Sequence, residues 1–252
     1  MIRALKRAFR KTLNKHKVGM LRVLFFTSCA LCLAVIITTL RVNDGLEVMN
    51  AQAGYAIKSV ETEEKIYSYT STLTGKETLQ ELYMLSNVLE ELEVKVTFFV
   101  GSEWIGKNVT VFEKLSSGGH IFGLYIDKDF SGDSRNEIMR YIAKENDAFF
   151  TVTGKYPKYV RVKNDNSGKI NEVLNAYCQY NVSCSFILAQ SSKGNIAIGN
   201  IVDLDASDPN VPYIALGAIS SANKKGLVAV GLNELLYGFE SEVDSNGTQK
   251  EK

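Results

Sequence analysis

The chain has 252 residues with 29 basic and 28 acidic side chains, which gives a formal net charge of +1. Residues 1–41 hold nine of the basic side chains and none of the acidic ones, so residues 42–252 carry 20 basic and 28 acidic side chains, a net charge of −8. An acidic domain of this kind argues against nucleic acid as a partner and against adhesion to anionic lipids or polymers. Neutral ligands or protein partners fit it better.

The N-terminal part of the chain predicts a membrane anchor. Residues 1–22 are basic, and Val23–Leu40 then run for 18 residues without a charge, which is long enough for a helix that crosses most of a hydrocarbon layer of about 30 Å. Because the basic residues precede this helix, residues 1–22 are expected in the cytoplasm and the later domain outside the cell. The alternative is a signal peptide cleaved near Ala51–Ala53, but the apolar run ends well before that point. A single-pass protein of the cell membrane is therefore predicted.

Beyond the anchor, residues 41–62 are small, polar and aperiodic, which predicts a stalk. Residues 63–239 then alternate strand-like and helix-like segments. The strand-like segments are 66–70, 94–100, 120–125, 159–162, 182–188, 196–204 and 227–230. The helix-like segments are 79–92, 112–115, 136–152, 170–177 and 214–223. This alternation predicts an α/β domain with a parallel sheet, as in a distorted (β/α) barrel. The charged tail, residues 240–252, has no apolar face and is predicted to be disordered.

Cys178 and Cys184 lie where a helix-like segment ends and a strand-like one begins. In an oxidising compartment they form a disulfide if their Cα atoms come within about 7 Å. Otherwise they are two half-buried thiols, and the sequence leaves both outcomes open.

Four stretches resemble motifs of one enzyme family. Val94–Val100 is similar to a strand ending in A-T-F-F-V, and Gly118–Gly123 is similar to A-G-H-E-I-G. Thr153–Arg161 resembles T-G-x-x-P-x-x-F-R, and Lys225–Leu236 resembles a closing G-Y-x-F-V-T-L-S-E-L-L. In order and spacing they resemble the polysaccharide deacetylases, the NodB-homology domain of carbohydrate esterase family 4. The resemblance covers about residues 64–238.

The resemblance implies a distorted (β/α) barrel with its site at the carboxyl ends of the strands. It also implies hydrolysis of an N-acetyl or O-acetyl group on a sugar. In that chemistry a divalent metal held by one Asp and two His activates water, a second Asp acts as base and a late His acts as acid.

At the positions where that chemistry needs Asp and His, this sequence has other residues. The motif T-F-D-D-G aligns with the stretch that begins Tyr69–Thr72, and the motif H-S-x-x-H aligns with Tyr125–Asp129. Of R-P-P-Y-G only the arginine is retained, and the late histidine aligns with an aspartate. The aligned catalytic positions are Ser71, Thr72, Tyr125, Asp129, Arg161 and Asp205. Because hydroxyls are poor zinc ligands and poor bases at neutral pH, no catalytic residue, resident metal or cofactor is expected.

The leading hypothesis is a membrane-anchored extracytoplasmic pseudoenzyme that binds glycan or a protein of the cell envelope. Its candidate ligand-binding residues are Tyr125, Asp127, Asp129, Arg161 and Asp205. Arg161 either holds a ligand carboxylate or pairs with a nearby aspartate. One alternative is an active carbohydrate de-N/O-acetylase in which Asp127, Asp129 and Asp205 hold zinc or another divalent metal through oxygen alone. The other is a structural subunit of an envelope complex.

Overall fold

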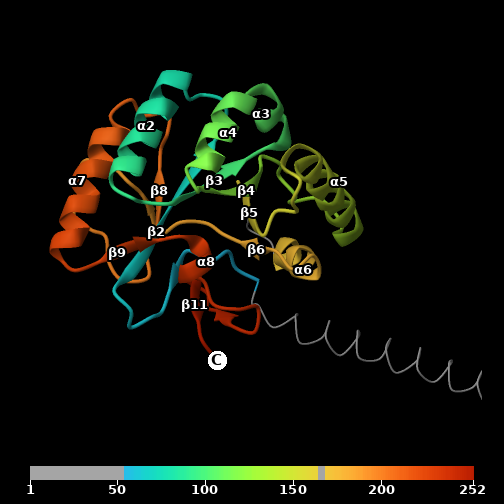
Figure 1. The fold of residues 1–252 in the computed structure, drawn as a ribbon. Coiled ribbons are helices and arrows are strands. Elements are labelled where there is room, and N and C mark those ends of the chain that lie inside the picture. Colours follow the sequence, from blue (N-terminus) through green and yellow to red (C-terminus); the bar gives the residue numbers. More distant parts are fainter. Residues whose placement is uncertain (1–53, 164–167) are drawn as a thin grey trace, which may run out of the picture. The chain divides into compact units, whose positions relative to one another are not determined.

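The computed structural model describes residues 54–163 and 168–252, in which eight strands form one curled sheet (Figure 1). The strand order is β6-β5-β4-β3-β2-β8-β7, with β9 paired to β2, and each pair in this sheet is parallel. The strands are β2 Ile66–Leu73, β3 Val96–Val100, β4 Ile121–Ile126, β5 Tyr159–Val162, β6 Tyr180–Asn181, β7 Phe186–Ile187, β8 Ile201–Leu204 and β9 Val228–Val230. The predicted parallel α/β fold is therefore confirmed.

Helices pack against the outer face of the sheet (Figure 1), except the last and shortest one, whose Leu232 and Leu235 belong to an apolar cluster inside the curl. They are α2 Leu79–Glu91, α3 Ser102–Lys107, α4 Val109–Ser117, α5 Arg135–Thr153, α6 Gly168–Ala176, α7 Val211–Lys224 and α8 Leu232–Leu235. The local sequence explains where the longer helices begin, because Thr78 with Glu81 and Ser134 with Glu137 form capping boxes at α2 and α5. Helix α5 ends at Gly154, whose φ of 72° is the left-handed conformation that glycine adopts without steric cost.

The two faces of the sheet bury different side chains, because successive residues of a strand point to opposite faces. On β2, Tyr69 belongs to the large apolar cluster against the helices, whereas Thr70 and Thr72 lie on the concave face. On β3, Phe98 joins the helix-facing cluster and Phe99 joins a second cluster inside the curl of the sheet. The concave face is therefore where polar side chains of neighbouring strands meet.

The segment before β2 is part of this fold. Ile57 is 1 % exposed and pairs in parallel with Val182, just after β6. The Val60 N–H donates to the Gly199 carbonyl at 2.8 Å, just before β8. At Gly199, where φ is 73°, a Cβ would lie 1.8 Å from the Val60 oxygen, so only glycine allows this approach. The segment thus fills the space between β6 and the start of β8.

The end of the chain forms a second, small sheet with the same segment. β1 Ser59–Val60 pairs in parallel with β11 Thr248–Lys250, which pairs antiparallel with β10 Glu242–Val243. Gln249 is fully buried, and its side-chain amide bonds the backbone of Tyr237 and the Ser241 hydroxyl. These bonds tie the tail to the body of the domain.

The predicted extents of the stalk and of the disordered tail are wrong, because parts of both segments belong to the small sheet. Residues 54–62 do not form part of a stalk, and residues 240–252 are not a disordered tail, since both contribute strands to the small sheet. Strands of two or three residues are too short to show an alternating pattern, and most of the tail is polar. Neither segment therefore carries a periodic signal that could be read along the chain.

The basic segment 1–22, the apolar segment 23–40 and residues 41–53 lie outside the described residues. Within residues 54–163 and 168–252, we find no helix of the length and apolarity that crossing a membrane requires.

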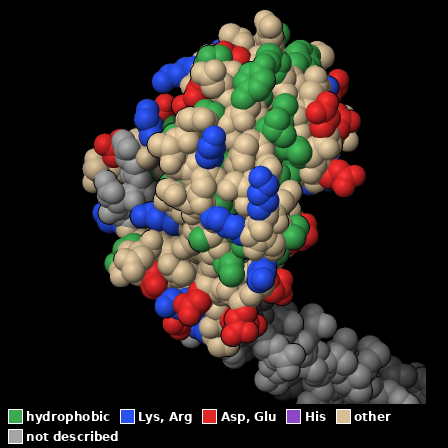
Figure 2. All heavy atoms as spheres, turned by 90° about the vertical axis from the view of Figure 1, so that its left-hand side faces the viewer, with side chains coloured by type: hydrophobic (Ala, Val, Ile, Leu, Met, Phe, Trp, Pro, Cys, Tyr) green, Lys and Arg blue, Asp and Glu red, His purple; other side chains and the backbone are tan. Residues whose placement is uncertain are grey.

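The outer face that carries α7 and β9 exposes apolar side chains among basic ones (Figure 2). On α7, Tyr213 and Leu216 are 65 % and 46 % exposed, and on β9 Val228 is 57 % exposed. Single exposed apolar residues are common on soluble domains.

Candidate functional site

The centre of the concave face is occupied by the side chain of Arg161, which β5 carries. Its Nη1 forms an ion pair with Asp203 of β8 and donates to the Thr72 Oγ1 at 2.8 Å, while its Nη2 donates to the Thr70 Oγ1 at 2.8 Å. The Thr70 hydroxyl in turn donates to the Asp203 carboxylate at 2.8 Å. Arg161 and Asp203 are 8 % and 9 % exposed, so this is a buried charge pair.

The remaining donors of Arg161 go to the backbone that follows β6. Its Nε donates to the Val182 carbonyl at 3.1 Å, and its Nη2 also donates to the Ser183 carbonyl at 3.0 Å. The guanidinium lies 4.3 Å from the centre of the Phe99 ring, which adds a cation–π contact. A guanidinium has five N–H donors, and the five bonds to its surroundings use all of them. The arginine is therefore fully satisfied by this chain, without a ligand.

Side chains of β2 point alternately to the two faces of the sheet, and this decides which of the aligned residues reach Arg161. Thr72 does, whereas the Ser71 side chain points to the opposite face, where its hydroxyl donates to the Leu204 carbonyl at 2.7 Å. Thr70, which aligns with an apolar position of the family motif, was not among the predicted site residues. Its place beside Asp203 follows from the parallel pairing of β2 with β8, which local sequence does not reveal.

Tyr125 and Asp127 lie at the carboxyl end of β4, next to the arginine. Tyr125 is the direct neighbour of Arg161 in the pairing of β4 with β5, and it is partly buried against the inner apolar cluster. Burial, and then the charge of Asp127, raise the pKa of the Tyr125 phenol, so it stays neutral at physiological pH. Asp127 is exposed and pairs with Lys163 at 2.7 Å.

The other two predicted carboxylates hold their own loops. The Asp129 Oδ1 accepts from the Ser131 N–H at 2.9 Å, and the Asp205 Oδ1 accepts from the N–H and the hydroxyl of Ser207 at 3.1 and 2.6 Å. Each is an Asx-type turn within one loop. Of the predicted site residues, the structure thus brings together Arg161, Thr72 and Tyr125, and gives Asp127, Asp129 and Asp205 separate local partners.

The residues at this centre do not fit the divalent metal that the resemblance implies. A buried guanidinium holds the carboxylate of Asp203, and the other contacting side chains are the hydroxyls of Thr70 and Thr72. A second cation at this place would meet a positive charge and only one carboxylate. In the described ranges, 54–163 and 168–252, no three His, Cys, Asp or Glu side chains lie together as metal ligands.

The two cysteines of the domain are separate thiols. Cys178 and Cys184 are both free, and β6 Tyr180–Asn181 runs between them. Of the two alternatives, the structure therefore has separate thiols. Burial raises the pKa of the Cys184 thiol and leaves it protonated at neutral pH.

The buried position of His120, the histidine of the stretch Gly118–Gly123, predicts that the stability of the domain depends on pH. It is 8 % exposed, its Nδ1 accepts from the Val96 N–H at 3.2 Å, and burial together with the charge of Lys95 lowers its pKa to about 4. Since an unfolded histidine titrates near 6.5, the unfolded state binds more protons than the folded state between these values. The free energy of unfolding should thus have its full value above pH about 6.5 and fall by up to about 3 kcal/mol as the pH drops to about 4.

This prediction is checked by urea unfolding from pH 7.5 to 4. Carboxylates also titrate in this range, so the quantity to follow is the difference between the wild type and His120→Asn, which keeps an acceptor for the Val96 N–H without an imidazole. The slope attributed to His120 should vanish in that variant and persist in His16→Asn, which removes the other histidine of the chain. An equal pH slope in the wild type and His120→Asn would contradict the assignment.

Comparison with known proteins agrees with this geometry at the level of fold. The sequence model of the family described as polysaccharide deacetylase matches residues 80–181. A sequence comparison with curated proteins gives no match.

Three solved structures illustrate the similarity. A family 4 carbohydrate esterase from Bacillus anthracis is 21 % identical with a TM-score of 0.64, and the alignment covers 75 % of this chain and 89 % of that one. The chitin deacetylase from Colletotrichum lindemuthianum is 18 % identical with a TM-score of 0.63, covering 74 % and 93 %. A CE4 family pseudoenzyme from Bacillus anthracis is 13 % identical with a TM-score of 0.63, covering 79 % and 74 %. The chain is therefore similar to polysaccharide deacetylases over residues 80–181, and its domain has the fold of the family 4 carbohydrate esterases.

Proposed function

We propose that this domain is a pseudoenzyme: a polysaccharide deacetylase fold that hydrolyses no acetyl group and acts by binding a glycan or a protein of the cell envelope. The observation that carries the proposal is the Arg161–Asp203 pair with Thr70 and Thr72, which occupies the concave centre with its own mutual contacts. Hydrolysis by the family's route needs a metal-bound water and a base at such a centre. The groups found here supply neither.

The comparisons provide a precedent for a protein that has this fold and is a pseudoenzyme. One structural neighbour is described as a CE4 family pseudoenzyme, and another is a mutant of that protein with restored enzymatic activity. The neighbours are 13 % and 15 % identical to this chain, so the support concerns the fold and the precedent.

The proposed place of action rests on the sequence of the preceding residues. The uncharged run Val23–Leu40 behind a basic start supports a single-pass anchor, with residues 1–22 in the cytoplasm and the domain outside the cell. The acidic balance of residues 42–252 favours neutral glycans or proteins over nucleic acid as bulk partners.

Activity and metal content test the proposal together. The purified protein is incubated with zinc, cobalt or manganese, dialysed, and analysed for bound metal, and acetate release is measured on acetylated chito-oligomers and on peptidoglycan. We expect acetate at the level of the protein-free blank and metal well below one ion per chain, with an active family 4 esterase as the positive control. Sustained turnover would refute the proposal, and chelator-sensitive turnover abolished by Asp129→Asn would establish the all-oxygen hydrolase instead.

Binding assays separate the two forms of a non-catalytic role. Retention of the protein on immobilised chitin or peptidoglycan would support glycan binding. Failure to bind either glycan, with co-purification of one membrane protein, would support a structural subunit of an envelope complex.

A further inference from the structure

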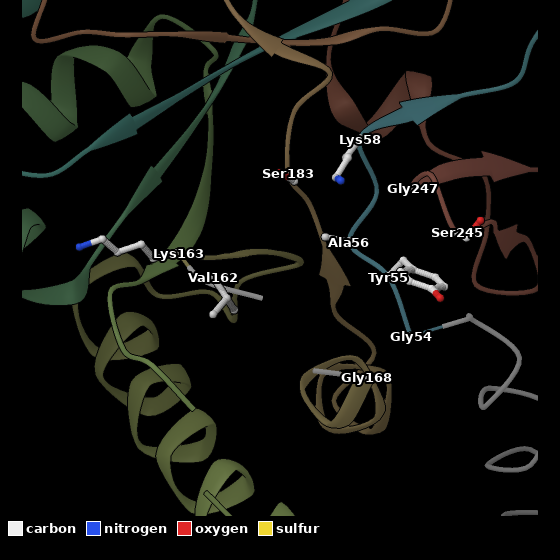
Figure 3. A pocket seen from close by; sticks show the side chains of 10 residues that line it. All are labelled: Gly54, Tyr55, Ala56, Lys58, Val162, Lys163, Gly168, Ser183, Ser245 and Gly247. Carbon is white, nitrogen blue, oxygen red and sulfur yellow. The ribbon is translucent and has the colours of Figure 1, made fainter. Parts of the chain in front are cut away.

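Beside Arg161 and its partners, the domain has a cavity that the family chemistry does not explain. It is a cavity of about 690 Å³ bounded by the segment before β1, the carboxyl end of β5, the residue after β6, the start of α6 and the turn between β10 and β11 (Figure 3). Small-molecule sites in proteins are commonly of this size. Its walls include parts of the N-terminal and C-terminal segments for which the sequence predicts no regular structure.

The cavity wall carries one lysine without a counter-charge. Lys58 points into the space between Ser183 and Ala56 (Figure 3) and makes no ion pair with any side chain of the described ranges. Lys163 also lines the cavity, but its ammonium group extends away from the other labelled residues and pairs with Asp127. Among the described residues, the cavity therefore presents a single available ammonium group.

The other contacting groups suit a ring that carries hydroxyls. The Tyr55 side chain lies in the wall and is 49 % exposed, Ser245 brings a hydroxyl group, and Ser183 lines the wall from a separate loop. Gly247 has a φ of 83°, and a Cβ there would lie 2.6 Å from the Ala56 oxygen, so the turn backbone itself forms part of the wall. An aromatic face with surrounding hydroxyl and backbone groups is a chemistry that binds sugars.

We propose that this cavity binds a short saccharide bearing one carboxylate, with the carboxylate paired to Lys58 and the sugar ring against Tyr55. The inference rests on the glycan-binding form of the proposed function and assigns it a site outside the concave centre. A single cation in an otherwise acidic domain selects a ligand with one negative charge, because a polyanion would meet the net repulsion of the domain.

The test uses two pairs of sugars that differ in the carboxylate: glucuronic acid with glucose, and N-acetylmuramic acid with N-acetylglucosamine. Dissociation constants of the purified full chain are measured by ligand-observed NMR. The acid of at least one pair should bind about tenfold or more tightly than its neutral partner, a preference that Lys58→Gln removes. Tyr55→Ala should weaken both members of that pair. Lys144→Gln is the control, because it makes the same charge change on an exposed part of α5.

Equal binding of acid and neutral sugar in both pairs, absence of binding in both, or an unchanged preference in Lys58→Gln would overturn the proposal. Thermal unfolding of each variant checks that it is folded. Acetate release is measured on the same preparations. If only the cavity proposal fails, acetate stays at the level of the blank. If the pseudoenzyme proposal fails, acetate rises above it.

Discussion

Replacing Arg161 with methionine is expected to lower the free energy of unfolding by about 3–5 kcal/mol, because it leaves the buried carboxylate of Asp203 without its cation. The carbonyls of Val182 and Ser183 lose their donors as well. The measurement is urea denaturation at pH 7 followed by tryptophan fluorescence and circular dichroism. If Arg161→Met does not fold, Arg161→Lys, which keeps the charge but not the five-donor geometry, gives the smaller loss.

The double variant Arg161→Met/Asp203→Leu shows whether the loss comes from the orphaned charge. Removing both partners should restore a large part of the stability, since a buried ion pair contributes little net energy compared with apolar groups of similar size. The matched control is Lys163→Met, which breaks the exposed pair with Asp127 and should cost less than about 1 kcal/mol. A loss of that small size in Arg161→Met would show that the guanidinium is not a structural part of the centre.

Deleting residues 241–252 is expected to cost about 3 kcal/mol or more, because the deletion exposes apolar surface and removes the partners of buried backbone groups. Val243 and Gln249 are 2 % and 0 % exposed. Strand β11 pairs with β1, which belongs to the segment between β6 and the start of β8. Thermal and urea unfolding measure the loss. If the shortened chain does not fold, Gln249→Ala tests the same contacts by removing the three hydrogen bonds of that side chain.

The control for the truncation is deletion of Glu251 and Lys252 alone. These residues are exposed, and Lys252 makes only a surface ion pair with Glu242 at 3.6 Å, so the effect should stay within about 0.5 kcal/mol. If deleting residues 241–252 changed stability no more than this, the tail would be as dispensable as its polar sequence suggests.

The sequence predicted the main sheet because its strands are apolar runs separated by amphipathic helices, and both signals extend over several residues. Val96–Val100 is buried at every position, and α2 buries Leu82, Leu85 and Leu89 at helical spacing. The small sheet was missed because two-residue strands such as β1 and β10 carry no such repeat. These short strands form because the two ends of the domain contact each other.

The candidate site was predictable in part for a similar reason. Motif order identified Arg161 and Thr72, but a linear alignment assigns positions without the direction of each side chain. Ser71 therefore looked equivalent to Thr72, although the pleat of β2 turns it to the helix-facing side. Asp203 emerged as the partner of Arg161 because β8 lies beside β2, a pairing of strands separated by more than 100 residues that local sequence does not specify.

The position of the segment Ile57–Val60 has a mechanical consequence. It hydrogen-bonds to Gly199, two residues before β8, on one side and to β6 and β11 on others, through bonds that run across the strand direction. Tension applied from the preceding residues acts along the strand, so these bonds are loaded in shear and must yield together. A pull on the chain from the N-terminal side of Ile57 is therefore carried into the sheet through several hydrogen bonds at once.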